Sequence, residues 1–321
     1  MDQVAASGAR GAEDAFRLDV GGGVALHVYR WLPAGAPKAV VQVVHGMVEH
    51  AARYARFAQA LNAAGYAVYA HDQRGHGKSA ASPADLGFFA EQNGWERIVD
   101  DVYAVTRRVG DELPGVPLFV LGHSMGARVV LTYLFAHGGG LAGAMLSGAG
   151  GNAAAGAAAG RVVAKLERLR LSARGRSKLL GKLAFGPYNK RFAPARTEFD
   201  WLSRDPVEVD KYMADPLCGF DFTAQAWIDF LSAIIAVDRA ENLKRIPARL
   251  PMYLFSGALD PVGAETRGVR WLIEALRRAG VTDVAHRFYE GARHELLNET
   301  NRDEVVRDLI GWLDATLARR K

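Results

Sequence analysis

The sequence of 321 residues has a single cysteine, Cys218, and no long apolar run. One thiol excludes a disulfide within the chain. No stretch reaches the roughly 18 consecutive apolar residues that a membrane-spanning helix needs. The first 13 residues are mostly small or polar and lack the apolar segment of a secretory signal peptide. We therefore expect a cytoplasmic location and a disordered segment at residues 1–13.

Metal-binding patterns are also missing. The nine histidines are scattered, and neither a His-Glu-x-x-His helix nor a closely spaced pair of cysteines occurs. The net charge is +5, but no motif that reads nucleic acid accompanies the positive charge. The sequence therefore predicts no metal, no other cofactor and no nucleic-acid partner.

What the sequence does contain is an alternation of short apolar runs with amphipathic stretches. A leading hairpin is expected within residues 14–32, and strands are expected near 38–44, 66–70, 116–121, 141–147, 251–257 and 284–289. Helices are expected near 51–64, 95–109, 126–137, 264–279 and 301–318. This alternation is typical of an α/β fold with a mostly parallel central sheet flanked by helices.

The alternation is interrupted once, after an alanine- and glycine-rich segment at residues 148–160. From there to about residue 242 the chain has helical but not strand periodicity. We interpret residues 151–242 as a helical cap, or lid, inserted into a core made of residues 14–150 and 243–321.

The pentapeptide Gly-His-Ser-Met-Gly at residues 122–126 occurs once, between an expected strand and an expected helix. In a strand-turn-helix, glycines two residues on either side of a serine remove the Cβ atoms that would collide where the chain doubles back. The serine hydroxyl then stands clear of the backbone. The pattern predicts that Ser124 is a catalytic nucleophile.

A serine hydroxyl needs a base and an orienting carboxylate to become reactive. Asp260 and His294 each lie in the loop after a late expected strand, in the order serine, acid, histidine that this turn type predicts. Sites of open α/β sheets gather at the carboxyl ends of strands. The alternative base His286 fits less well because it lies within an expected strand. The alternative acid Asp238 fits less well because no expected strand leads into it.

Acyl transfer also needs main-chain donors for the oxyanion of the transition state. The N–H of Met125, directly after the nucleophile, supplies the first. Met47 is the candidate for the second, because it follows Gly46 in the short loop after the strand expected at 38–44.

Three segments together resemble the monoacylglycerol lipase and lysophospholipase branch of the α/β-hydrolases. They are His-Gly-Met-Val-Glu-His at 45–50 followed by Arg53-Tyr54, Asp-Gln-Arg-Gly-His-Gly-Lys-Ser at 72–79, and the pentapeptide at 122–126. The resemblance covers most of residues 15–318 and is weakest between about 151 and 245. It implies the same triad and the same two oxyanion amides, in the α/β-hydrolase fold.

The expected reaction is a two-step hydrolysis of a small lipid ester, either a monoacylglycerol or a lysophospholipid. A broad carboxylesterase and a small-peptide aminopeptidase are alternatives, and outside enzymology an inactive ligand-binding protein. A peptidase needs an acid in the cap to hold the substrate's amine. Five acids there, Glu198, Asp200, Asp205, Asp210 and Asp215, keep that alternative open.

The cap begins with ten lysines and arginines against one acid between residues 161 and 191, interspersed with apolar residues. Such a stretch can place an apolar face toward lipid and a basic rim toward anionic headgroups, although a solvated basic face is the plainer interpretation. Contact with an anionic membrane is therefore a hypothesis. Among the cap's aromatic residues, we expect Phe220 or Phe222 to contact the acyl chain and Trp201 to dock the cap on the core.

Overall fold

The computed structural model describes residues 13–320. The segment predicted to be disordered lies outside them, apart from Glu13, at which the first strand begins. One eight-stranded sheet has the order β1-β2-β4-β3-β5-β6-β7-β8. Its strands are β1 (Glu13–Asp19), β2 (Ala25–Trp31), β3 (Ala39–Val44), β4 (Tyr66–His71), β5 (Leu118–His123), β6 (Gly143–Ser147), β7 (Met252–Gly257) and β8 (Val284–Tyr289). The two pairings of β2 are antiparallel and the others are parallel.

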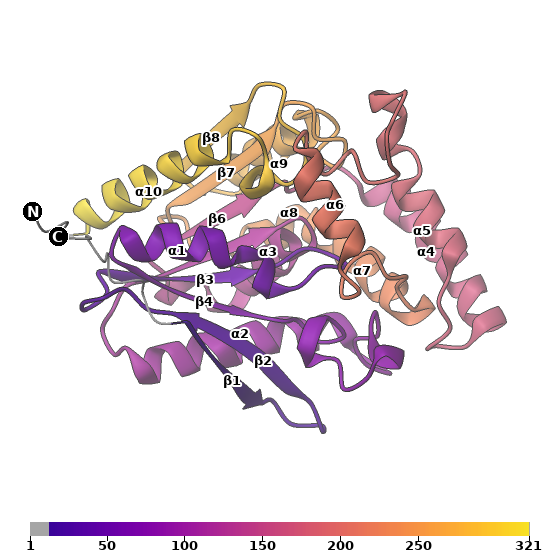
Figure 1. Cartoon of the computed structure of the whole chain (residues 1–321), viewed down its shortest axis with the longest axis horizontal. Coiled ribbons are helices and arrows are strands. Elements are labelled where there is room, and N and C mark those ends of the chain that lie inside the picture. Colours follow the sequence, from indigo (N-terminus) through magenta and orange to yellow (C-terminus); the bar gives the residue numbers. More distant parts are fainter. Residues whose placement is uncertain (1–12, 321) are drawn as a thin grey trace, which may run out of the picture.

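The sheet separates two apolar cores. Along β3, Val40 and Val44 face one core and Val41 and Val43 face the other, as the two-residue period of a strand requires. Helices α2 (Gly94–Glu112), α3 (Met125–His137) and α9 (Arg267–Arg278) cover the first face, and α1 (Ala55–Ala63) and α10 (Arg302–Ala318) cover the second (Figure 1). The prediction of an α/β fold with a mostly parallel sheet is confirmed.

Between β6 and β7 the chain, described throughout this interval, forms helices and no strand, with one isolated bridge from Arg176 to Thr223. The helices are α4 (Ala154–Leu171), α5 (Lys178–Phe185), α6 (Pro206–Ala214), α7 (Ala224–Val237) and α8 (Ala240–Leu243). Figure 1 shows α4 to α7 gathered at one end of the molecule. No helix in the described part of the chain has the length and apolar content required to cross a bilayer.

A buried ion pair joins this helical segment to α3. Arg128 lies in α3, one turn after Ser124, and its Nη1 is 2.5 Å from Asp238 Oδ1. The other oxygen of Asp238 accepts the main-chain N–H of Ala153 at 2.9 Å. Because Ala153 precedes α4 and Asp238 follows α7, one carboxylate connects both ends of the segment to α3. Asp238, the rival candidate for the catalytic acid, is thus engaged by Arg128.

Substitution Asp238→Ala is expected to lower the free energy of unfolding by about 3–5 kcal/mol, because it leaves the guanidinium of Arg128 buried without a partner. Urea unfolding followed by circular dichroism measures the loss. Glu274→Ala is the control: its ion pair with Arg277 is exposed, so its removal should change the free energy by less than about 1 kcal/mol. Equal effects of the two substitutions would contradict the prediction.

Candidate active site

Ser124 stands at a sharp turn between β5 and α3, as predicted. Its backbone has φ 54° and ψ −116°, a conformation that a residue with a side chain adopts only when its surroundings enforce it. The neighbouring glycines explain how. A Cβ on Gly126 would lie 2.1 Å from the carbonyl oxygen of Val44, so only glycine lets α3 approach the end of β3 this closely.

Asp260 and His294 meet beside this turn. His294 Nδ1 lies 3.0 Å from each carboxylate oxygen of Asp260, and both side chains are buried. The carboxylate also accepts hydrogen bonds from the Ser256 hydroxyl and the Val262 N–H, which fix its orientation. Because Nδ1 is engaged, Nε2 remains for other partners. His294 and Ser124 line the same pocket.

The electrostatic surroundings distinguish His294 from its neighbour His123, whose ring centroid is 4.7 Å away. Burial acts to lower the pKa of His294, but the charge and hydrogen bond of Asp260 outweigh it and the pKa lies above the ordinary 6.5. Burial, together with the nearby His294, lowers the pKa of His123 to about 4. His294 is therefore suited to accept a proton, whereas His123 stays neutral.

The loop that follows β3, residues 46–50, lies against Ser124, since a Cβ on Gly46 would be 3.3 Å from the Cβ of Ser124. We call it the Gly46 loop. Met47 and Met125 both line the pocket, and among the described residues the hydrogen bonds outside helices and strands include none donated by either main-chain N–H. The N–H of Met125 is the first of α3, where helix amides lack partners and favour negative charge. Both residues thus border the pocket beside Ser124.

The pocket that contains Ser124 has about 690 Å³ of empty space, which includes its opening to solvent, and is mostly apolar. Its aromatic lining residues are Phe185, Tyr188, Phe199, Trp201, Tyr212, Trp227 and Phe230. The ring of Trp201 lies 5.2 Å from that of His294. A long apolar chain is the kind of group that such a wall accommodates.

The structure does not place Phe220 and Phe222 among the described residues that line this pocket. Both rings pack instead against His76, at 5.4 and 5.5 Å, and Phe222 is buried in the core. Trp201, expected only to dock the cap, occupies the wall beside His294. Trp201 packs in a small hydrophobic cluster with Leu202 and partly buried aromatic residues of the same segment. The surface by which this segment packs on the rest of the protein is therefore also the surface that lines the pocket.

The five acids that were candidates to hold a peptide's amine lie elsewhere. None of them belongs to the pocket lining within the described residues. Asp205 pairs with Arg302, and Asp210 pairs with Arg196. The two carboxylates that do line the pocket, Glu49 and Glu295, come from the core, and sequence reasoning missed them.

A second contact joins the helical segment between β6 and β7 to the Gly46 loop. His50 Nε2 lies 2.8 Å from Asp215 Oδ2, and Cys218 brings its sulfur within 4.8 Å of the ligand atoms of both. Residues of these types can hold zinc, but here His50 Nε2 and Asp215 Oδ2 are paired with each other. Nearby, the Gly219 N–H donates to the carbonyl of Val48 at 2.9 Å. These contacts thus join the segment between α6 and α7 to the Gly46 loop.

A strained serine between strand and helix and a buried histidine-aspartate pair, both at the carboxyl edge of a mostly parallel sheet, define a serine hydrolase of the α/β-hydrolase class. Residues 35–301 match the serine aminopeptidase S33 family, and the chain belongs to that family. The resemblance inferred from the three sequence segments is confirmed, as is the prediction of an enzyme that hydrolyses esters.

Similar proteins cover nearly the whole chain. A monoacylglycerol lipase of Mycolicibacterium smegmatis is 30% identical over 91% of this chain and 94% of its own length. A human monoglyceride lipase is 31% identical over 90% and 86%. Among solved structures, a thermostable carboxyl esterase from Bacillus coagulans in complex with glycerol has a TM-score of 0.88 and 28% identity, covering 95% of this chain and 99% of that one.

Proposed function

We propose that the protein hydrolyses monoacylglycerols and that Ser124, His294 and Asp260 are its catalytic triad. Ser124 Oγ attacks the ester carbonyl while His294 takes its proton, and Asp260 orients the imidazole and stabilises its charged form. The amides of Met47 and Met125 bind the oxyanion. His294 then protonates the departing glycerol oxygen, and water releases the fatty acid by the same steps. The observation that supports this most is that Ser124 and the Asp260-bound His294 share one apolar pocket.

The charge of the pocket favours a neutral headgroup. Glu49 and Glu295 line it, and the single guanidinium of Arg53 contacts both, so two carboxyl groups stand against one guanidinium. Carboxylates accept hydrogen bonds from hydroxyl groups but repel a phosphate. The names of the relatives from M. smegmatis and human point to the same substrate.

Comparative hydrolysis tests this proposal. The purified protein is offered 1-oleoylglycerol, 1-oleoyl lysophosphatidylcholine and leucine p-nitroanilide, and kcat/KM is measured for each. We expect the glycerol ester to exceed the lysophospholipid by at least about tenfold. A preference for the lysophospholipid would overturn the headgroup assignment, and a preference for the anilide would favour the aminopeptidase alternative. No hydrolysis of any substrate, together with no labelling of Ser124 by a fluorophosphonate, would favour a ligand-binding protein.

We further propose that residues 151–242 form a cap over the core and that α4 brings it to anionic membranes. Val162, Leu166 and Leu169 are 60%, 61% and 85% exposed, and their spacing of four and three residues places them on one helix face. Lys165 and Arg168 flank this stripe and are also exposed. An apolar stripe with a basic rim is the arrangement that binds the interface of an anionic bilayer.

Substitution of both Leu166 and Leu169 by serine is expected to weaken vesicle binding by at least about tenfold, because each leucine contributes roughly 1.5 kcal/mol when it leaves water. Sedimentation with phosphatidylcholine vesicles, with and without phosphatidylserine, measures the binding. Serine at Val207 and Met213, which are comparably exposed on α6, is the control and should change nothing. Vesicle binding that is the same with and without phosphatidylserine would refute the proposal.

A further inference from the structure

Arg53 joins the two loops that flank Ser124. Its Nη1 donates to Glu49 Oε2 at 2.6 Å. The same guanidinium grips Glu295 with two parallel hydrogen bonds of 2.7 Å. Glu49 belongs to the Gly46 loop, and Glu295 directly follows His294. A single side chain therefore connects the loop that supplies one oxyanion amide with the loop that carries the base.

The remaining oxygen of Glu49 acts directly on the Gly46 loop. Oε1 accepts the N–H of Gly46 at 2.6 Å and the hydroxyl of Tyr54 at 3.0 Å. A Cβ on Gly46 would lie 2.7 Å from this oxygen and 3.3 Å from the Cβ of Ser124. The loop is thus held between the carboxylate and the nucleophile. Glu49 fixes the peptide that immediately precedes the amide of Met47.

The same three side chains set the charge beside the reacting atoms. Glu49 and Glu295 are buried and line the pocket of Ser124, and the side chain of Arg53 is 12% exposed. In such a place a carboxylate stabilises a protonated His294 and destabilises a negative oxyanion. The guanidinium offsets one of the two negative charges and, through its planar fork, holds both carboxylates at fixed distances.

We propose that Arg53 is a positioning residue for the hydrolysis: by bridging Glu49 and Glu295 it holds the Met47 amide and the His294 imidazole in register with Ser124. This inference rests on the proposed function. The guanidinium fixes the positions of the two loops, and the carboxylates set the charge near His294. Different substitutions remove each of these two effects. Arg53→Lys keeps the charge but removes the fork. Glu295→Gln keeps much of the shape but removes one negative charge.

The charged and titratable groups that face His294 are Asp260, His123, Glu295 and Glu49, with Arg53 behind the two glutamates. Arg53→Lys changes none of these four groups, and Glu295→Gln changes one of them. In Arg53→Lys, kcat is expected to fall about 10- to 100-fold, because misplacement of about 1 Å costs a rate of that order, while KM stays within about twofold and the acid limb of the pH profile stays in place. In Glu295→Gln, the acid limb is expected to move to lower pH, because a negative charge near the imidazolium is lost.

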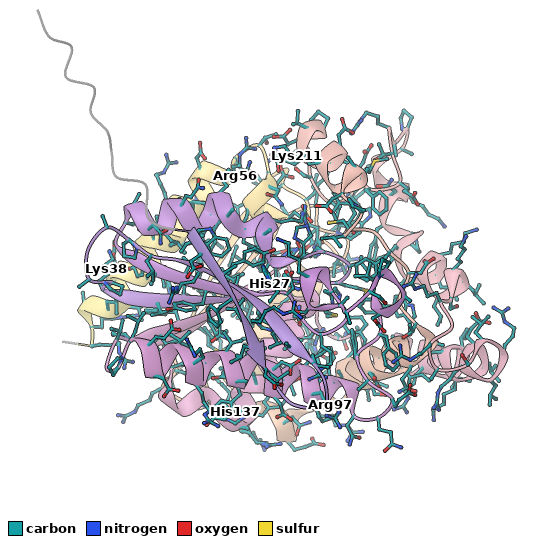
Figure 2. All side chains as sticks on the ribbon, turned by 60° about the horizontal axis from the view of Figure 1, so that its bottom comes forward. His27, Lys38, Arg56, Arg97, His137 and Lys211 are labelled. Atoms are coloured by element: carbon teal, nitrogen blue, oxygen red, sulfur yellow. The ribbon has the colours of Figure 1, made fainter. Side chains whose placement is uncertain are left out.

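The measurements use p-nitrophenyl butyrate and 1-oleoylglycerol, with rates normalised to the sites that a fluorophosphonate titrates to completion. The matched control is Arg56→Lys. Arg56 lies in α1 and pairs with Glu208, and Figure 2 shows it at the periphery near Lys211, which contacts the same glutamate. Its substitution should leave kcat within about twofold.

Two results would overturn the inference. One is a kcat for Arg53→Lys that matches the Arg56→Lys control, or a loss confined to KM. The other is an acid limb in Glu295→Gln that stays fixed or moves to higher pH. If the proposed function is wrong, the result is different: the unsubstituted protein hydrolyses neither ester and does not react with the fluorophosphonate.

Discussion

Substitution Ser124→Ala is expected to lower kcat for ester hydrolysis by about six orders of magnitude, the loss known for removal of a serine nucleophile from another hydrolase. Without the hydroxyl no acyl-enzyme forms, and the oxyanion amides and substrate binding alone retain only a modest rate above that of water. Hydrolysis of 1-oleoylglycerol and covalent labelling by a fluorophosphonate measure the effect. Both should disappear together.

Ser147→Ala provides the matched control for this prediction. Ser147 is a buried serine whose hydroxyl lies 3.2 Å from His123 Nδ1, and its main-chain oxygen, which accepts the Ser124 N–H, is unchanged by the substitution. Its turnover should stay within about tenfold of the unsubstituted protein. Turnover of Ser124→Ala near that of the unsubstituted protein would remove Ser124 from the mechanism.

Substitution Asp260→Asn has the second largest expected effect, a fall in kcat of about four orders of magnitude. The asparagine amide can hold His294 in the wrong tautomer, and the negative charge that favours the imidazolium is lost. The pH profile carries a separate signature. Asp260 raises the pKa of His294 above 6.5, so kcat/KM of the unsubstituted protein should fall as the pH decreases through a midpoint above 6.5. In Asp260→Asn the midpoint should move to lower pH.

The rival acid gives the control. Asp238→Asn preserves an acceptor for the Ala153 N–H and lies with Arg128 rather than with His294. Per folded molecule it should retain turnover within about tenfold, with an unmoved acid limb. A larger loss in Asp238→Asn than in Asp260→Asn would reverse the assignment of the acid.

Sequence reasoning located the core well because its signals are local. The expected strand at 284–289 coincides with β8, and the helix expected at 301–318 is one residue longer than α10. Apolar runs bounded by turn residues fix such elements without knowledge of the rest of the fold. The same logic brought Ser124, Asp260 and His294 together, since loops after parallel strands open at one edge of the sheet.

The pocket wall and the arginine bridge were beyond this reasoning. The cap aromatics follow no period that distinguishes a docking face from a pocket face, so Phe222 was expected in the pocket and Trp201 outside it. The contact between Arg53 and Glu295 joins residues 242 positions apart. The sequence around either residue does not predict this pairing, because the pairing depends on how two loops meet in space.

The ion pair between Arg128 and Asp238 constrains how this enzyme can be re-engineered. Arg128 lies in α3 and Asp238 directly follows α7, so a chimaera that grafts residues 151–242 from a relative replaces the anion and keeps the cation. Unless the donor has an acid at position 238, the graft leaves the guanidinium of Arg128 in α3 buried without a partner. An exchange of residues 151–242 to alter chain-length preference therefore also requires the donor's residue at position 128.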